Sequence, residues 1–263
     1  HGEKNIFDYK LFFFGDIKIS PDHIPHLAND LIGYIVGYLG VSKKCLVLDL
    51  DNTLWGGVVG EDGFNGIKLG PDPPGNAYVE FQKILLSLYQ RGVILAINSK
   101  NNRDDALKVI REHPCMVLRE EHLSIMKINW EDKTSNMREI ANDLNIGLDS
   151  IIFIDDDPVN REFMKLKIPE ILTIDLPNDP SQYVEVIKGI NDLNVLKITY
   201  EDTQRGKMYY EQQKRNELEN TITDLDGFLK QLNLKVIIKN ANEFTIPRIS
   251  QLTLKTNQFK DRK

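Results

Sequence analysis

The chain has 263 residues, with 33 Lys and Arg, 39 Asp and Glu, and two Cys. This length suits one large domain or one domain with a modest appendage, and two cysteines exclude a disulfide scaffold and fit a reducing compartment such as the cytoplasm. A net charge of −6 argues against general nucleic-acid binding, and no apolar run reaches the length of a membrane span.

Helix and strand patterns alternate along the first three quarters of the chain. Apolar residues at helical spacing follow Ser20-Pro21 and stop at Gly40. Further helices are predicted over 76–91, 104–112 and 133–144. Short apolar runs predict buried strands over 45–50, 93–97, 116–118, 151–154 and 171–174. Such alternation predicts a Rossmann-like α/β fold, a parallel sheet with helices on both faces.

Three regions are expected. Residues 1–40 form an N-terminal helical segment packed on the core, 41–198 form the catalytic core, and 199–263 form an appended α+β segment. The last region should hold helices over 201–220 and 225–232 and a strand over 234–238, and we expect a further domain after it because no stop signal closes it.

Charge is distributed unevenly. Residues 1–195 carry 20 basic and 30 acidic side chains, whereas 196–263 carry 13 and 9. The basic last quarter is typical of a solvated helical surface, and a face that meets an acidic partner is the alternative.

Polar side chains stand at the ends of the predicted strands. Asp49 and Asp51 follow the first strand and Ser99 ends the second. Lys133 opens the helix that leads to the fourth strand, which Asp155-Asp156 follow. Because the carboxyl ends of parallel strands meet at one edge of a sheet, these side chains are expected to form one site.

The chemistry that this set suits is phosphoryl transfer. Asp49 can attack phosphorus, and Asp51, on the same side of the chain, can protonate the leaving oxygen and then activate water. Ser99 can donate to a phosphate oxygen, and Lys133 supplies positive charge. Converging carboxylates need a cation, and Mg²⁺ prefers such oxygen ligands. The candidate ligands are Asp49, Asp51, Asp155 and Asp156.

Other phosphate and cation motifs fit less well. An EF-hand loop fails because Leu54 and Gly60 stand where Gly and Glu are needed, and Gly56–Gly60 lacks the Gly-Lys-Ser/Thr ending of a P-loop. Residues 54–75 are instead expected to form a small lid over the site. A phospho-receiver-like signalling module remains a rival, although receivers need no Asp-x-Asp at the nucleophile and have no insertion of this size after it.

The Asp49–Thr53 segment, Ser99, Lys133 and Asp155-Asp156 resemble the four motifs of the haloacid dehalogenase (HAD) superfamily of phosphatases. A closer resemblance, to the FkbH-like family, covers nearly the whole chain. It rests on residues 44–57, 60–63, 99–102, 118–122, 128–130, 248–253 and 255–259.

The FkbH-like resemblance implies a function in polyketide biosynthesis. Such a protein takes a three-carbon unit from 1,3-bisphosphoglycerate, removes the phosphate and loads the unit onto the phosphopantetheine thiol of an acyl carrier protein, sometimes beside other megasynthase domains. A plain small-molecule phosphatase is the alternative. The expected contacts to substrate or phosphate are Thr53, Trp55, Gly57, Ser99, Lys100, Asn101 and Arg119. Arg119 is included because it directly follows the predicted third strand, 116–118, and could grip a second phosphate or carboxylate.

One residue departs from the FkbH-like pattern. Members usually have a cysteine before the serine of the second motif, and this chain has Asn98. A thiol there could carry the acyl group, so Asn98 is a candidate catalytic position that puts an enzyme thioester in doubt. Cys45 and Cys115 are poor substitutes, since both are predicted to lie in the core, away from the site.

Overall fold

The computed structural model describes residues 6–221, 238, 240–243 and 245–246. The chain divides into two units, His1–Asn216 and Glu217–Lys263, and the account below concerns the first. The helix predicted over 225–232 lies outside the described residues, as does the strand predicted over 234–238 except for its last position.

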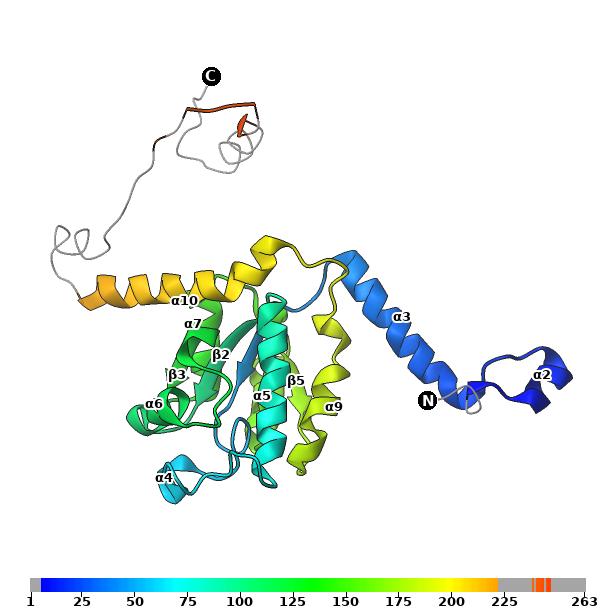
Figure 1. Ribbon diagram of the computed structural model, residues 1–263, viewed down its shortest axis with the longest axis horizontal. Helices are drawn as coiled ribbons and strands as arrows, with labels where there is room; N and C mark the ends of the chain where they lie inside the picture. The colour runs from blue at the N-terminus through cyan, green and yellow to red at the C-terminus, as the bar shows by residue number, and fades with distance from the viewer. Residues whose placement is uncertain (1–5, 222–237, 239, 244, 247–263) are drawn as a thin grey trace. The chain divides into compact units, whose positions relative to one another are not determined.

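A five-stranded parallel sheet forms the centre of the first unit (Figure 1), and its order is β3-β2-β1-β4-β5. The strands are β1 Cys45–Leu48, β2 Ile94–Ser99, β3 Leu123–Ile128, β4 Ile151–Asp155 and β5 Leu172–Asp175. Every pairing is parallel, with β1 between β2 and β4. The predicted Rossmann-like α/β fold is confirmed.

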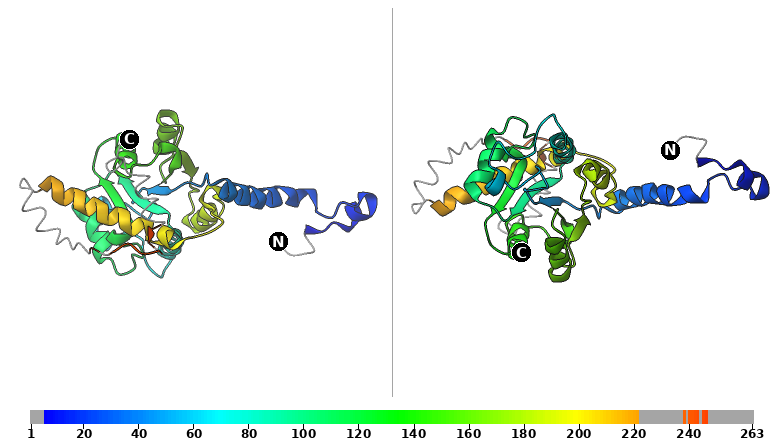
Figure 2. Two further views of the ribbon diagram at one scale, coloured as in Figure 1. Left: turned by 90° about the horizontal axis from the view of Figure 1, so that it is seen from above. Right: turned by 90° about the horizontal axis from the view of Figure 1, so that it is seen from below.

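Helices cover both faces of the sheet (Figure 2). On one face α5, α6 and α9 pack on even-numbered residues of β1, and on the other α7 and α8 pack on its odd-numbered residues. This alternation is the period of two expected of a strand buried on both sides. The α-helices are α2 Tyr9–Gly15, α3 Ile24–Leu39, α4 Val59–Asp62, α5 Gly75–Gln90, α6 Arg103–Glu112, α7 Lys133–Asp143, α8 Pro158–Lys167, α9 Tyr183–Lys188 and α10 Tyr200–Thr221.

The third strand is not where the sequence predicts it. Residues 116–118 are buried at Met116 and Leu118 but form no strand, and β3 begins at Leu123. The side chain of Gln82 in α5 accepts hydrogen bonds from the backbone N–H groups of Val117 (2.8 Å) and Leu118 (3.1 Å). A side chain therefore satisfies this buried backbone where a neighbouring strand was expected to do so.

The insertion after β1, residues 54–75, packs on the core in this structure. Leu54 and Trp55 are fully buried, and Ile67 joins them in the cluster on the α5 face. Gly56 and Lys68 exchange backbone hydrogen bonds of 3.0 and 2.7 Å. The insertion thus covers the sheet beside the carboxyl end of β1, and its opening as a lid stays a prediction.

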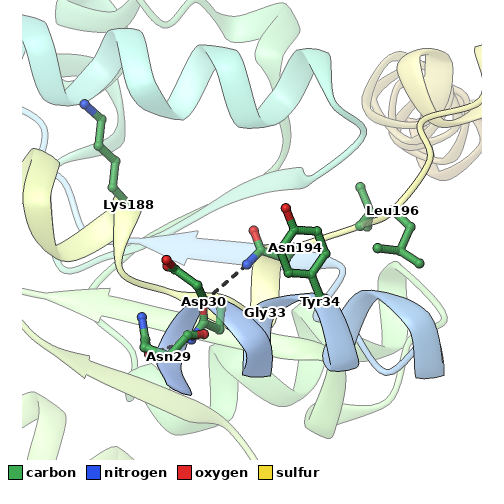
Figure 3. A pocket seen from close by; sticks show the side chains of 9 residues that line it. Asn29, Asp30, Gly33, Tyr34, Lys188, Asn194 and Leu196 are labelled. Carbon is green, nitrogen blue, oxygen red and sulfur yellow. Dashed lines mark hydrogen bonds between the residues drawn. The ribbon is translucent and has the colours of Figure 1, made fainter. Parts of the chain in front are cut away.

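The N-terminal helix α3 touches the rest of the unit through small residues. A Cβ added at Gly33 would lie 2.4 Å from Asn194 Nδ2, and one added at Gly37 would lie 3.2 Å from the backbone nitrogen of Leu196. Asn191 Nδ2 also donates to Asn29 Oδ1 at 2.6 Å, so a hydrogen bond between two amides holds α3 against residues 191–196. Figure 3 shows the polar hollow of about 550 Å³ beside this contact.

Most of α3 is nevertheless exposed. Gly33 is its buried residue, while large apolar side chains such as Leu31 and Tyr38 face solvent. Among the described residues, no helix is long and apolar enough to cross a membrane.

The first part of the predicted appendage packs on the core. In α10 the backbone of Gly206 lies against the ring of Tyr89, and its carbonyl accepts from Ser124 Oγ at 3.3 Å. Arg205 Nη1 donates to the Gly92 carbonyl at 3.0 Å. The compact unit accordingly continues to Asn216.

An ion-pair network ties α10 to α6. Glu120 lies 2.6 Å from Arg111 Nε and 3.1 Å from Lys214 Nζ, with 18% of its side chain exposed. The hydrogen bond from Arg111, more than the one from Lys214, lowers the pKa of Glu120 from 4.5 to about 2.

Glu120→Gln should therefore lower the free energy of unfolding near neutral pH by about 1–2 kcal/mol. Because the folded-state pKa is depressed, the carboxylate's contribution is complete above about pH 4.5 and is lost as the pH falls through about 2. Urea titrations of wild type and variant should converge over that range. Glu80→Gln, at an exposed pair with Lys83, is the matched control, and a difference that persists unchanged to pH 2 would contradict the assignment.

Candidate active site

The strand register brings the polar strand ends together. Leu48, the last residue of β1, pairs with Ile97 on one side and Ile154 on the other. The next residue, Asp49, is therefore flanked by Asn98 and Asp155. The parallel strand register therefore brings these three residues together at the carboxyl edge of the sheet, as expected.

Lys133 lies between two of these carboxylates. Its Nζ is 2.9 Å from Asp49 Oδ2 and 2.6 Å from Asp155 Oδ2, and all three side chains are nearly or fully buried. Burial by itself would lower the pKa of Lys133, but the two carboxylates outweigh it and raise the pKa. The ammonium group is a fixed positive charge at the end of β1.

Asp49, Asp155 and Asp156 form an acidic cluster. One carboxylate oxygen from each lies within 4.8 Å of the others. Burial, and then the charges of Asp49 and Asp155, raise the pKa of Asp156 to about 6. Asp49 Oδ1 is buried and accepts no hydrogen bond within the described part of the chain. Three oxygen donors with one unpartnered buried atom suit a hard divalent cation.

The side chain of Asp51 lies outside this cluster, and its role as a metal ligand stays a prediction. Its Oδ1 accepts from Trp55 Nε1 (2.7 Å) and the Val59 N–H (3.1 Å), and its Oδ2 accepts from Asn101 Nδ2 (2.8 Å). Burial raises its pKa despite these three donors. A carboxyl that holds its proton longer suits a general acid.

The side chains of Trp55 and Asn101 both donate hydrogen bonds to the Asp51 carboxylate. Trp55 is fully buried, and its contact with substrate stays a prediction. Asn101 also accepts the Asn102 N–H at 3.0 Å, which orients its amide.

The turn after Asp49 needs special backbone conformations. Asn52 has φ +53°, and its side chain accepts the Gly57 N–H at 2.8 Å. Gly57 has φ +91°, and a Cβ there would lie 2.3 Å from Asp62 Oδ2. Thr53 Oγ1 is buried and has no partner in the part of the chain that is described. Gly57 therefore shapes the turn, and the contact of Thr53 with a phosphate stays a prediction.

The remaining predicted contacts are divided between the two edges of the sheet. Ser99 ends β2 beside the site, and Lys100 follows it with an exposed side chain. Arg119 precedes β3, at the amino edge, where its Nη1 donates to the carbonyls of Ile110 and Arg111 at 3.2 Å. Its expected place beside the site assumed a third strand at 116–118, and the structure does not bring Arg119 to the carboxyl edge.

Asn98 belongs to a buried amide network. Its Nδ2 donates to the Lys133 carbonyl at 2.8 Å, and its Oδ1 accepts from Asn136 Nδ2 at 3.2 Å. Asn136 Nδ2 also donates to Asn129 Oδ1 at 2.9 Å. Asn98 therefore fixes the first turn of α7, which carries the Lys133 ammonium.

Sequence reasoning missed Asn129 and Asn136. The signal for Asn136 was its type, because an Asn inside a helix is unfavourable unless its amide is bonded. Asn98→Ala should lower the free energy of unfolding by about 1–3 kcal/mol, since it removes two buried hydrogen bonds, to the Lys133 carbonyl and from Asn136. Urea denaturation measures this, with exposed Asn76→Ala as the control, and equal stability of the two variants would contradict the network's importance.

Of the two cysteines, Cys45 lies where the sequence predicts, in the core and away from the site. Cys45 begins β1, is fully buried, and has a pKa raised by burial. Cys115 is half-buried, and a Cβ added at Gly70 would lie 3.9 Å from its Sγ. Cys45 therefore offers no reactive thiol beside Asp49.

Comparison with known proteins gives a likeness to a solved bacterial structure. No protein-family model matches the chain, and no curated protein matches it. The crystal structure of the N-terminal part of BF1531 from Bacteroides fragilis contains a phosphatase domain complexed with Mg. Its sequence is 38% identical to this chain, and the two structures superpose with a TM-score of 0.70. The match covers 76% of this chain and 53% of that one, so the chain spans about half of that structure's length.

A second solved structure is an uncharacterized protein from Corynebacterium glutamicum. It is 11% identical, with a TM-score of 0.39 over 60% of this chain and 99% of that one, and it carries no argument.

Proposed function

We propose that this chain is a Mg²⁺-dependent phosphoryl-transfer enzyme of the HAD type. The observation that carries the proposal is Lys133, held between Asp49 and Asp155 with Asp156 alongside. The four sequence motifs that resemble the HAD superfamily supply these residues, and the similar Bacteroides structure contains a phosphatase domain complexed with Mg.

Asp49 is the proposed nucleophile and Asp51 the acid and base. An Asp49 oxygen forms a bond to phosphorus as the bond from phosphorus to the leaving oxygen breaks, and Asp51 gives that oxygen its proton. Asp51 then takes a proton from water, which attacks phosphorus and releases Asp49 and inorganic phosphate. Lys133 offsets the charge on the phosphoryl oxygens throughout.

Asp49, Asp155 and Asp156 would hold Mg²⁺, which would neutralise charge between the carboxylates and the phosphate. Thr53 and Ser99 are proposed to donate to phosphate oxygens. Lys100, exposed beside the site, is proposed to meet the substrate's outer charge.

The finer proposal concerns substrate and acceptor. We infer that the phosphorylated substrate is 1,3-bisphosphoglycerate or a related glycerate, and that its three-carbon acyl unit passes to the thiol of an acyl carrier protein. The support is the resemblance to the FkbH-like family over nearly the whole chain. The buried amide of Asn98 favours direct attack by the carrier thiol, because an amide bonded to Lys133 offers no acyl nucleophile.

A plain phosphatase is the second candidate. The amide of Asn98, at the position where a thiol is usual, favours it, since hydrolysis needs no thiol.

Intact-mass measurement of the carrier separates the two. The protein is incubated with Mg²⁺, 1,3-bisphosphoglycerate and holo carrier protein. Acyl loading predicts a carrier heavier by one three-carbon acyl unit, whereas phosphate release with an unmodified carrier would support the plain phosphatase. Asn98→Cys tests the enzyme thioester: a hydroxylamine-sensitive adduct on this variant would show that a thiol at this position can accept the acyl group.

A further inference from the structure

Arg161 carries a buried guanidinium group at the end of β4. It lies one turn into α8, and 10% of its side chain is exposed. Its Nη1 donates to the backbone carbonyl of Asp155 at 2.8 Å and to that of Asp156 at 2.5 Å. One nitrogen therefore holds two successive carbonyl groups of the backbone that carries the acidic cluster.

The same guanidinium group also reaches the neighbouring strand. Asp155 is paired in register with Asp175, the last residue of β5. Arg161 Nε lies 3.2 Å from Asp175 Oδ1. Arg161 thus joins the ends of both strands, where the backbone ladder between them stops and buried carbonyl groups need other donors.

The carboxylates of Asp155 and Asp156 are held in different ways. The Asp155 carboxylate accepts from Lys133 Nζ at 2.6 Å and from the Asp157 N–H at 2.9 Å. Within the described residues, no other side chain donates a hydrogen bond to the Asp156 carboxylate. The direction in which Asp156 projects into the acidic cluster is therefore set by its backbone, whose carbonyl accepts from Arg161.

The charge of Arg161 by itself would act against a metal ion. A cation beside the cluster repels Mg²⁺, so an Arg161 that acted only through its charge would weaken Mg²⁺ binding, and its removal would tighten it. Groups that orient metal ligands have the opposite effect, because their loss typically weakens metal binding by about 10- to 100-fold. The sign of the change in Mg²⁺ affinity therefore separates the two roles.

We propose that Arg161 is a positioning residue for the metal site and acts by fixing the backbone from which Asp155 and Asp156 project. A guanidinium group suits this task because its planar fork donates in several directions at fixed geometry and stays charged. This inference rests on the proposed function, to whose Mg²⁺ site it adds a residue that holds the ligands.

Lys165 offers a matched control on the same helix. Its Nζ also lies 2.9 Å from Asp175 Oδ1, and it lies 2.9 Å from Glu162 Oε1. Lys165→Met therefore removes an α8 cation that pairs with carboxylates, whereas Arg161→Met removes one that also holds the two carbonyl groups.

The test measures the Kd of Mg²⁺, added alone to the full chain, by isothermal titration calorimetry. Arg161→Met should raise this Kd by about tenfold or more. Lys165→Met should change it by less than about twofold, because exposed ion pairs contribute little. Arg161→Lys keeps the charge but offers a single nitrogen on a flexible stem, so it should also raise the Kd.

Phosphate release from acetyl phosphate gives a second readout. Both Arg161 variants should need more Mg²⁺ for half-maximal release, by the same factor as the increase in Kd, and saturating Mg²⁺ should restore most of the rate. Lys165→Met should need as much Mg²⁺ as wild type.

Circular dichroism and thermal unfolding without Mg²⁺ establish that each variant is folded. If Arg161→Met does not fold, the Kd of Arg161→Lys decides. Unchanged or tighter Mg²⁺ binding by the folded variant that decides would overturn the positioning role, since a residue that only stabilises the fold leaves the Kd of the folded protein unchanged.

Failure of the proposed function gives a different result. Mg²⁺ binding that depends on Arg161, without release of phosphate from acetyl phosphate or 1,3-bisphosphoglycerate, would keep the positioning role and reject the enzyme. Mg²⁺-dependent phosphate release with a Kd that is independent of Arg161 would keep the enzyme and reject the positioning role.

Discussion

Asp49→Asn should reduce phosphate release by about a thousandfold or more, because the amide keeps the shape of the carboxylate but cannot form the bond to phosphorus. The fold should survive, since Asn retains an oxygen that can accept from Lys133. Turnover with acetyl phosphate and 1,3-bisphosphoglycerate measures the first effect, and thermal unfolding measures the second.

The control for Asp49→Asn is Asp72→Asn, which removes an exposed carboxylate from the insertion after β1. Its turnover should match wild type. Near-normal turnover by Asp49→Asn, at saturating Mg²⁺, would contradict the role of Asp49 as nucleophile.

Lys133→Met should abolish activity and also lower the free energy of unfolding by about 3–5 kcal/mol. The variant leaves Asp49 and Asp155 buried without their shared cation, and an unpaired buried charge costs about this much. The stability deficit should shrink as the pH is lowered, because protonation removes the uncompensated carboxylate charge in the folded state.

Added Mg²⁺ should restore part of the stability of Lys133→Met, since a cation bound by the acidic cluster offsets the same charges. Urea denaturation with and without Mg²⁺ measures this. Lys83→Met, at an exposed pair with Glu80, should change stability little. A Lys133→Met protein as stable as this control would mean that the buried ion pairs contribute little to folding.

The sheet and the charged centre of the site could be predicted because their signals are local. Apolar runs bounded by turn residues placed β1, β2, β4 and β5 to within a few residues. Given parallel strands, the positions of Asp49 and Asp155 at strand ends were sufficient to bring them together. Lys133 followed because it opens the helix before β4.

The errors come from groups whose partners are distant in sequence. Residues 116–118 look like a strand, but Gln82, more than 30 positions earlier, satisfies their backbone. The expected place of Arg119 beside the site depended on that strand. Trp55 has the residue type and position of a substrate contact, but its ring is buried and its N–H is bonded to Asp51.

Asn98 is the residue whose interpretation changes most. Its position before Ser99 suggested a side chain facing substrate, and the strand register does place it beside Asp49. Its amide is nevertheless bonded to Lys133 and Asn136, which sequence spacing could not reveal. A positioning role through Lys133 follows from these contacts.

The most direct test of the proposed chemistry is to trap the phosphorylated enzyme. Wild-type protein, with Mg²⁺ and 1,3-bisphosphoglycerate, is quenched in acid within the first turnover and digested, and the peptide that contains Asp49 is weighed. The mechanism predicts a mass increase of one phosphoryl group on Asp49, absent from Asp49→Asn and absent when Mg²⁺ is chelated. Steady phosphate release by wild type with no phosphorylated Asp49, or a phosphoryl group on another residue, would contradict it.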